Sequence, residues 1–287
     1  MKKRIVLSGL LAAALTLSLT ACGDSQADTS TDTDAAEGGD TAAETVVLKV
    51  AASPTPHAEI LEQVKPILAE QGIDLQVTEY SDYPIQNTVV DEGEEDANYF
   101  QHTPYLEQFN AENGTDLVSA GKIHYEPMGV YAGKTDSLEN LADGATIAVP
   151  NDATNEARAL QLLAAQGLIE IDPEAGLNAT PNDITSNPKN LEFTELDASM
   201  IANTIDEFDL NVINSNYALQ AGLNPAEDAL VSEDASSDAA QTYANIIAVK
   251  AGHENDPAIV ALVEALHSEE IQEFINSTYQ GSVLPID

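Results

Sequence analysis

Basic side chains are scarce in this 287-residue chain, which has 10 lysines and arginines against 49 aspartates and glutamates and a formal net charge of -39. Proteins that bind nucleic acids need a patch of lysine and arginine side chains facing the phosphates. Docking onto anionic lipid headgroups likewise needs clustered cations. The composition therefore argues against a nucleic-acid partner and against electrostatic attachment to an anionic membrane surface.

Cysteine is scarcer still, with Cys22 as the single example. One cysteine excludes a disulfide within the chain and a zinc site built from several thiolates. The glycine-rich nucleotide motifs and the G-x-S-x-G nucleophile motif are also missing. His57 and Glu59 resemble a ligand pair but have no third partner in sequence. We therefore expect no metal site, no cofactor and no enzymatic activity.

The N-terminus has the layout of a secretory signal peptide. Basic residues from Lys2 to Arg4 precede an apolar stretch from Ile5 to about Leu19, which is shorter than the roughly 20 residues of a membrane span. The sequence Leu-Thr-Ala-Cys that ends at Cys22 resembles the lipobox of bacterial lipoproteins. The resemblance implies cleavage before Cys22 and lipid on its sulfur and its new N-terminus, whereas the alternative is an uncleaved anchor helix with a buried cysteine.

Residues 23–44 consist of small and polar side chains, with no aromatic or branched aliphatic residue. Such a segment cannot bury enough apolar surface to offset its ordering entropy, so we expect an acidic, disordered tether. A calcium-binding tract is the alternative, but the fixed loop spacing of such sites is missing. Cleavage after residue 21 removes three cations, so seven remain and the charge becomes 7 - 49 = -42. Arg158 is the one arginine left.

Strand and helix patterns alternate from Thr45 onward. Branched apolar runs predict strands at 46–51, 75–79, 129–131, 147–149, 191–195, 210–213 and 246–249. Apolar residues at helical spacing predict helices at 57–71 and 152–166, and a C-terminal pair of helices that follows Asp256-Pro257. This alternation predicts an α/β fold with mainly parallel sheets. The pattern alone leaves open whether there is one sheet or two lobes.

Four longer segments carry a family resemblance. They are SPTPHAEIL at 53–61; YSDY at 80–83 with DANYFQHTPYL at 96–106; VPNDATNEARAL at 149–160; and NPKNL at 187–191 with VINSNYA at 212–218. In order and spacing they resemble the methionine-binding lipoproteins of bacterial ABC importers (NlpA/MetQ-like), from about Val46 to the C-terminus. One departure is Gln86-Asn87, where members usually carry Pro-Asn.

The resemblance implies a periplasmic-binding-protein-like fold of type II, with two α/β lobes joined by a two-strand hinge. Lobe 1 would comprise residues 45–125 and 245–287, and lobe 2 residues 126–244. The protein would be a monomeric receptor, anchored by lipid on the extracytoplasmic face of the cell membrane. It would bind L-methionine, with D-methionine as an alternative, and deliver it to an ABC permease and its ATPase.

The matching positions also imply ligand contacts. Tyr83, Phe100, His102 and Tyr105 are carried over as pocket residues, Asn155 and Asn214 as amide contacts and Arg158 as the carboxylate clamp. These residue types suit the ligand, because a carboxylate pairs best with a planar guanidinium, an ammonium group needs oxygen acceptors, and a thioether packs well on aromatic rings.

Helical spacing supports the assignment of Arg158. At about 100° per residue, Asn155 and Arg158 share one stripe of the predicted helix, while Leu160 and Leu163 fall on the opposite side. Asn98, Phe100 and His102 alternate as if they faced one way on an extended segment. The simpler alternatives are a surface ion pair for Arg158, ordinary core packing for the aromatic residues, and capping or turn roles for the asparagines.

Other functions remain open at this point. The pocket depth that would separate methionine from another small apolar amino acid or a dipeptide cannot be read from sequence. A surface lipoprotein for adhesion or signalling, without a transport role, is the alternative from a different functional class. Tyr217 and His57 are assigned structural roles.

Overall fold

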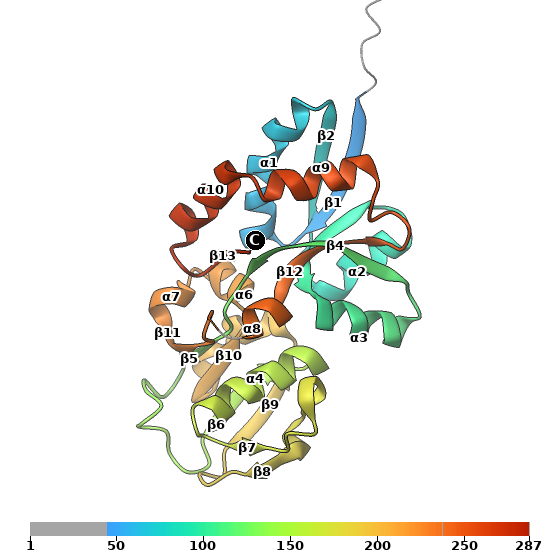
Figure 1. Ribbon diagram of the computed structural model, residues 1–287. Coiled ribbons are helices and arrows are strands. Elements are labelled where there is room, and N and C mark those ends of the chain that lie inside the picture. Colours follow the sequence, from blue (N-terminus) through green and yellow to red (C-terminus); the bar gives the residue numbers. More distant parts are fainter. Residues whose placement is uncertain (1–44, 237, 287) are drawn as a thin grey trace, which may run out of the picture. The chain divides into compact units, whose positions relative to one another are not determined.

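The computed structural model describes residues 45–236 and 238–286, all within one compact unit (Figure 1). Within these residues two mixed sheets are each covered by helices, so the predicted α/β fold is confirmed. None of the helices in these ranges has the length and apolar character needed to cross a bilayer. The predicted signal peptide, the lipidation site at Cys22 and the tether lie outside the described residues.

The first sheet has six strands in the order β13-β4-β12-β3-β1-β2. In chain order their bounds are β1 (Val46–Ala52), β2 (Ile73–Glu79), β3 (Ala97–His102), β4 (Leu117–Tyr125), β12 (Ala244–Lys250) and β13 (Leu284–Pro285). β1 runs parallel to β2 and β3, whereas β12 is antiparallel to both β3 and β4. The last two-residue strand pairs with β4 near Tyr125.

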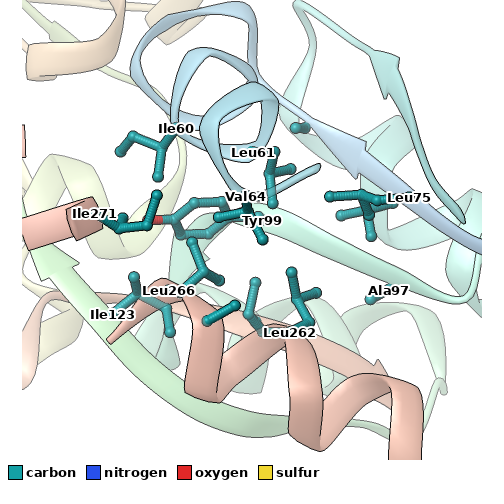
Figure 2. Close-up of a cluster of buried hydrophobic side chains, with 14 of the residues drawn as sticks. Ile60, Leu61, Val64, Leu75, Ala97, Tyr99, Ile123, Leu262, Leu266 and Ile271 are labelled. Carbon is teal, nitrogen blue, oxygen red and sulfur yellow. The ribbon is translucent and has the colours of Figure 1, made fainter. Parts of the chain in front are cut away.

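Helices pack on the first sheet according to the alternation of its side chains. On β12, Ile247 and Val249 belong to a core with α1 (Glu59–Ala69), α9 (Pro257–Leu266) and α10 (Glu269–Tyr279), part of which is drawn in Figure 2. Ile246 and Ala248 instead pack against Val90 and Leu106, which lie on α2 (Tyr83–Asp91) and α3 (Thr103–Asn113). Successive strand residues point to opposite faces, so both faces of β12 are covered.

The second sheet has five strands in the order β11-β5-β10-β6-β9. In chain order their bounds are β5 (Gly129–Ala132), β6 (Thr146–Pro150), β9 (Glu192–Leu196), β10 (Leu210–Ile213) and β11 (Ala229–Ser232). A separate pair is formed by β7 (Glu170–Ile171) and β8 (Ile184–Ser186). Helix α4 (Ala153–Ala165) contributes Leu160 and Leu163 to the core against Ile147 and Val149 of β6.

The remaining helical segments are short. They are η1 (Pro54–Ala58), η2 (Gly176–Asn178), η3 (Pro181–Asp183), η4 (Ala202–Glu207), α5 (Ala198–Ile201), α6 (Ser215–Gln220), α7 (Pro225–Asp228) and α8 (Asp238–Thr242). The helix predicted at 57–71 begins as the irregular turn η1 and becomes α-helical at Glu59. Of these segments, η1 and α6 carry residues that matter for the site.

The expectation of mainly parallel sheets is wrong. The chain passes from the first sheet to the second between β4 and β5 and returns between β11 and β12. β4 and β12 run antiparallel to each other, and β5 is antiparallel to β10 and β11. Parallel pairing is confined to β1 with β2 and β3, and to β6 with β9 and β10. Strands that carry the chain out of one sheet and back into it necessarily run in opposite directions.

Candidate functional site

All seven residues predicted to contact a ligand line a single pocket. They are Tyr83, Phe100, His102, Tyr105, Asn155, Arg158 and Asn214. The first four lie on α2, β3 and α3 beside the first sheet, and the other three lie on or next to α4 and α6 beside the second. The same pocket is lined by five residues that sequence reasoning did not select: Gln101, Glu126, Ser215, Asn216 and Asn245.

The pocket is small and nearly filled by its own side chains. Its free volume is about 20 Å³, far below the roughly 300 Å³ at which pockets for small ligands usually start. Some lining side chains therefore have to move for a ligand to enter.

Aromatic rings form one wall of the pocket. The ring of Tyr83 lies 5.3 Å from that of Phe100 and 5.7 Å from that of Tyr105, measured between centroids. These rings belong to a core cluster that also contains Ile213 of β10 and Ala148 of β6. Aromatic residues on and beside the first sheet therefore share a core with strands of the second sheet. They offer the apolar, polarizable surface that suits a thioether.

Local sequence explains how His102 and Asn155 are held. His102 precedes α3, and its Nδ1 accepts a hydrogen bond from the backbone N–H of Tyr105 at 3.2 Å. Nδ1 is thus unprotonated and Nε2–H donates to Oδ1 of Asn155 at 3.2 Å. Asp152 caps α4 by accepting from both the backbone N and Nδ2 of Asn155. Burial, followed by the charge of Arg158, lowers the pKa of His102 to about 3, so the ring is neutral.

Arg158 is buried and its guanidinium is already paired. Its Nε donates to Oε1 of Glu233 at 2.8 Å, and its Nη2 donates to Oε2 of Glu233 at 2.5 Å. Nη2 also donates to the backbone oxygen of Glu126 at 2.8 Å. Burial alone would lower the pKa of the guanidinium, but Glu233 outweighs burial and holds that pKa above its usual value. The bidentate partner found here is thus a protein carboxylate.

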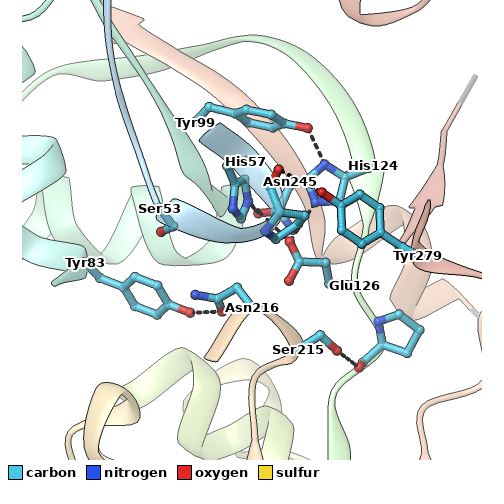
Figure 3. A network of polar contacts seen from close by, with 12 residues as sticks. Ser53, His57, Tyr83, Tyr99, His124, Glu126, Ser215, Asn216, Asn245 and Tyr279 are labelled. Carbon is cyan, nitrogen blue, oxygen red and sulfur yellow. Dashed lines mark hydrogen bonds and ion pairs between the residues drawn. The ribbon is translucent and has the colours of Figure 1, made fainter. Parts of the chain in front are cut away.

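Two asparagines present unpaired polar atoms next to the pocket. Nδ2 of Asn214 donates to Oδ1 of Asn155 at 3.0 Å. Oδ1 of Asn216 accepts from the hydroxyl of Tyr83 at 2.6 Å (Figure 3). Among the described residues, Oδ1 of Asn214 and Nδ2 of Asn216 are buried without a hydrogen-bond partner. Such orphaned groups are costly unless something pairs with them. These two amides therefore offer the pocket one free acceptor and one free donor.

A buried polar network lies behind the pocket (Figure 3). Nε2 of His124 lies 2.7 Å from Oε1 of Glu126, and Nε2 of His57 lies 3.3 Å from the same oxygen. His57 also contacts Oδ1 of Asn245 at 2.9 Å, and the hydroxyl of Tyr99 bonds to Nδ1 of His124. Burial lowers the pKa of His57 to about 4 and that of His124 to about 3, and it raises the pKa of Glu126.

This network is also the candidate metal-binding group of the described residues. The ligand atoms of His57, His124 and Glu126 lie within 4.8 Å of one another. Sequence reasoning considered His57 with Glu59, but the other two groups are His124 on β4 and Glu126 just after that strand, far along the chain. The hydrogen bonds already made by both Nε2 atoms account for the arrangement as two neutral imidazoles around one carboxyl group.

Two of the five pocket residues that sequence reasoning missed share one property. Glu126 and Asn245 lie where the chain leaves the first sheet after β4 and where it re-enters on β12. Both are buried polar residues. The strands next to them, β4 and β12, place apolar residues in the core. A polar side chain at a predicted crossing point is the signal that would have found them.

Asn98, expected to face the same way as Phe100, instead donates to Oδ1 of Asn87 at 2.8 Å.

Comparison with known proteins connects this architecture to a family. The family model described as NlpA lipoprotein matches residues 48–287. The methionine-binding lipoprotein MetQ of Bacillus subtilis is 46% identical over 242 residues, which cover 83% of this chain and 87% of that protein. The membrane lipoprotein TpN32 of Treponema pallidum is 39% identical over 227 residues, or 79% of this chain and 83% of that protein.

Solved structures agree with this relationship. A putative lipoprotein from Ruminococcus gnavus is 56% identical with a TM-score of 0.83, covering 84% of this chain and 99% of that one. A nutrient binding protein from Burkholderia cenocepacia, bound to methionine, is 41% identical with a TM-score of 0.80, covering 84% of this chain and all of that one, at 100%. By sequence and by fold, this chain belongs to the NlpA lipoprotein family.

Proposed function

We propose that this protein is the substrate-binding lipoprotein of an ABC importer and that it binds methionine in the pocket between its two sheets. The observation that carries the proposal is the convergence of Tyr83, Phe100, His102, Tyr105, Asn155, Arg158 and Asn214 on one pocket. Relatives named for methionine binding, and one solved with methionine bound, support the choice of ligand.

The chemistry of the pocket suits each part of a zwitterionic thioether amino acid. The aromatic wall would receive the side chain. The free acceptor of Asn214 and the carboxyl group of Glu126 would face the ammonium group, and the free donor of Asn216 would reach the carboxylate. Arg158 would donate to the ligand carboxylate through Nη1, because its Nε and Nη2 already donate to Glu233 and to the backbone oxygen of Glu126.

Ligand binding would act by shifting a population between open and closed arrangements. The pocket takes residues from β3 and β12 of the first sheet and from α4 and α6 beside the second, so ligand contacts favour the arrangement in which the sheets approach each other. The lobe limits are part of this proposal: residues 45–125 and 245–287 for lobe 1, and 126–244 for lobe 2. The strand membership of the two sheets supports these limits except at Ala244, which belongs to β12. X-ray scattering of refolded protein should give a smaller radius of gyration with methionine than without it, and equal radii would contradict closure.

Calorimetry on protein that lacks residues 1–22 tests the ligand. The protein is unfolded and refolded to remove any carried-over ligand, then titrated with L-methionine, D-methionine, leucine and a methionine dipeptide. We expect heat with at least one methionine enantiomer and weaker binding of leucine. Absence of heat with both enantiomers would refute the proposed ligand. Arg158→Lys keeps the charge but loses the planar fork, and unchanged methionine affinity in this variant would refute a role for the guanidinium.

The anchor and the transport partners complete the proposal. Lipid at Cys22 would hold the protein on the extracytoplasmic face of the membrane, next to the permease and ATPase that it supplies, and it would act as a monomer. Labelling cells with radioactive palmitate should mark the wild-type protein but not Cys22→Ala, and equal labelling would contradict this attachment point. Deleting the gene for the permease that it supplies should abolish methionine uptake through this receptor and leave methionine binding intact.

A further inference from the structure

Glu233 holds Arg158 more firmly than a surface ion pair would. The two side chains are 9% and 5% exposed, and two hydrogen bonds join them side-on. Oε2 of Glu233 also accepts from the hydroxyl of Tyr125 at 2.6 Å and from the backbone N–H of Met128 at 2.9 Å. The Arg158 guanidinium lies 4.4 Å from the ring centroid of Tyr243. Glu233 is therefore a fixed part of the wall behind the pocket.

The pairing of Arg158 with Glu233 determines the net charge around the pocket. Among the described residues that line it, Arg158 is the one cationic side chain, because burial keeps His102 neutral. His57 and His124 behind the pocket are neutral for the same reason. Glu233 thus cancels the single positive charge. The remaining carboxyl group in the lining is that of Glu126. Its salt-bridge contacts among the described residues are the imidazoles of His57 and His124, which are neutral.

We propose that Glu233 is a specificity-determining residue that neutralises Arg158, so that the pocket accepts a zwitterion and rejects a ligand that carries a carboxylate without an ammonium group. A zwitterion adds no net charge to a pocket whose one cation is already paired, whereas a monoanion adds an uncompensated negative charge in a buried region, where charges interact strongly. The inference rests on the proposed function, because it assumes an amino-acid ligand in this pocket.

Charge selection differs from mere positioning in what it predicts. If Glu233 only orients the guanidinium, its loss weakens every carboxylate ligand by the same factor. If it balances charge, its loss changes the ratio between ligands of different charge. Three ligands of nearly equal shape separate these cases: methionine, which has no net charge; 4-(methylthio)butanoate, which is a monoanion; and methioninamide, which is a cation.

The experiment measures the dissociation constants of these three ligands for wild-type protein and for Glu233→Gln, with competition against methionine for weak binders. We expect the preference for methionine over 4-(methylthio)butanoate to fall about tenfold in Glu233→Gln, and methioninamide to bind more weakly than it does to wild type. Glu192→Gln, on the exposed end of β9, makes the same change in net charge far from Arg158 in sequence and serves as the matched control.

Tyr125→Phe provides the second variant. It removes the hydroxyl that donates to Glu233 but leaves the carboxylate charge in place, so the ligand ratio should stay within twofold of the wild-type value. Equal ratios in wild type and Glu233→Gln would overturn the inference, as would no detectable binding of the monoanion to Glu233→Gln while methionine still binds. Failure of wild-type protein to bind methionine would instead overturn the proposed function, so the two failures are distinguishable.

Discussion

Nε2 of His102 lies 3.2 Å from Oδ1 of Asn155, and this contact joins the end of β3 in the first sheet to α4 beside the second. The same oxygen accepts from Nδ2 of Asn214 at 3.0 Å, next to α6. One amide oxygen therefore ties together three separate segments at the pocket wall. Its neighbours His102 and Asn214 are both buried, so neither could donate to bulk water if this oxygen were removed.

Asn155→Ala should weaken both methionine binding and folding. The substitution leaves the Nε2–H of His102 and the Nδ2–H of Asn214 without their acceptor, which should reduce the free energy of unfolding by about 1–3 kcal/mol. We expect methionine affinity to fall at least tenfold, measured by calorimetry alongside urea denaturation. Asn178→Ala, at an exposed position in η2, is the control. Affinity within twofold of wild type would show that Asn155 is not part of the binding site.

The Arg158–Glu233 pair should behave as a unit in stability measurements. Arg158→Met leaves the Glu233 carboxylate buried without its partner, which should cost about 3–5 kcal/mol of unfolding free energy in the ligand-free protein. Adding Glu233→Gln removes that charge, so the double variant should be more stable than Arg158→Met alone. Urea denaturation of wild type, both single variants and the double variant forms a complete cycle. Strictly additive effects would argue against a coupled pair.

Local periodicity made α4 predictable. Its apolar positions repeat at helical spacing, Asp152 is a common capping residue, and the stripe with Asn155 and Arg158 follows from the angle per residue alone. The prediction that Leu160 and Leu163 face the core is confirmed, since both are fully buried. The strands at 129–131, 147–149 and 210–213 were found for a similar reason, because short branched apolar runs between turns have few alternatives.

Contacts between residues far apart in the chain could not be predicted from the sequence. Glu233 lies 75 positions from Arg158 and is one of 49 acidic residues, so nothing local marks it as the partner. β4 was missed because Ser119, Gly121 and Lys122 interrupt its apolar pattern, and it is held in place by pairing with β12 and β13. The antiparallel direction of these strands depends on where the chain crosses between sheets, which is a property of the whole fold.

Stability should fall as the solution becomes acidic. Burial lowers the pKa of His57 from 6.5 to about 4, and that of His102 and His124 to about 3. Between pH 6.5 and 4 the unfolded chain binds protons at these histidines that the folded protein does not, so the free energy of unfolding decreases by about 1.4 kcal/mol per pH unit for each. Glu126 opposes this trend, because its raised pKa makes the folded state take up a proton earlier.

The His57→Gln variant tests this assignment. It removes one of the three titrating groups, so the slope of unfolding free energy against pH should decrease by about one proton in the same interval. The measurement is a set of urea denaturation curves at pH 7, 6, 5 and 4.5. His267→Gln, outside the network, is the matched control. An unchanged slope in His57→Gln would mean that this ring does not stay neutral in the folded protein.

Two phenylalanines of the same core cluster should separate ligand contact from packing. Phe100 and Phe109 are 4% and 8% exposed and share one cluster, but Phe100 lines the pocket and Phe109 does not. Replacing either by leucine should cost about 1–2 kcal/mol of stability, because ring volume and contacts are lost.

Phe100→Leu should also weaken methionine binding about fivefold to tenfold, since a polarizable wall facing the thioether is removed. Phe109→Leu should bind methionine as wild type does. Equal affinities in the two variants would place the thioether elsewhere in the pocket.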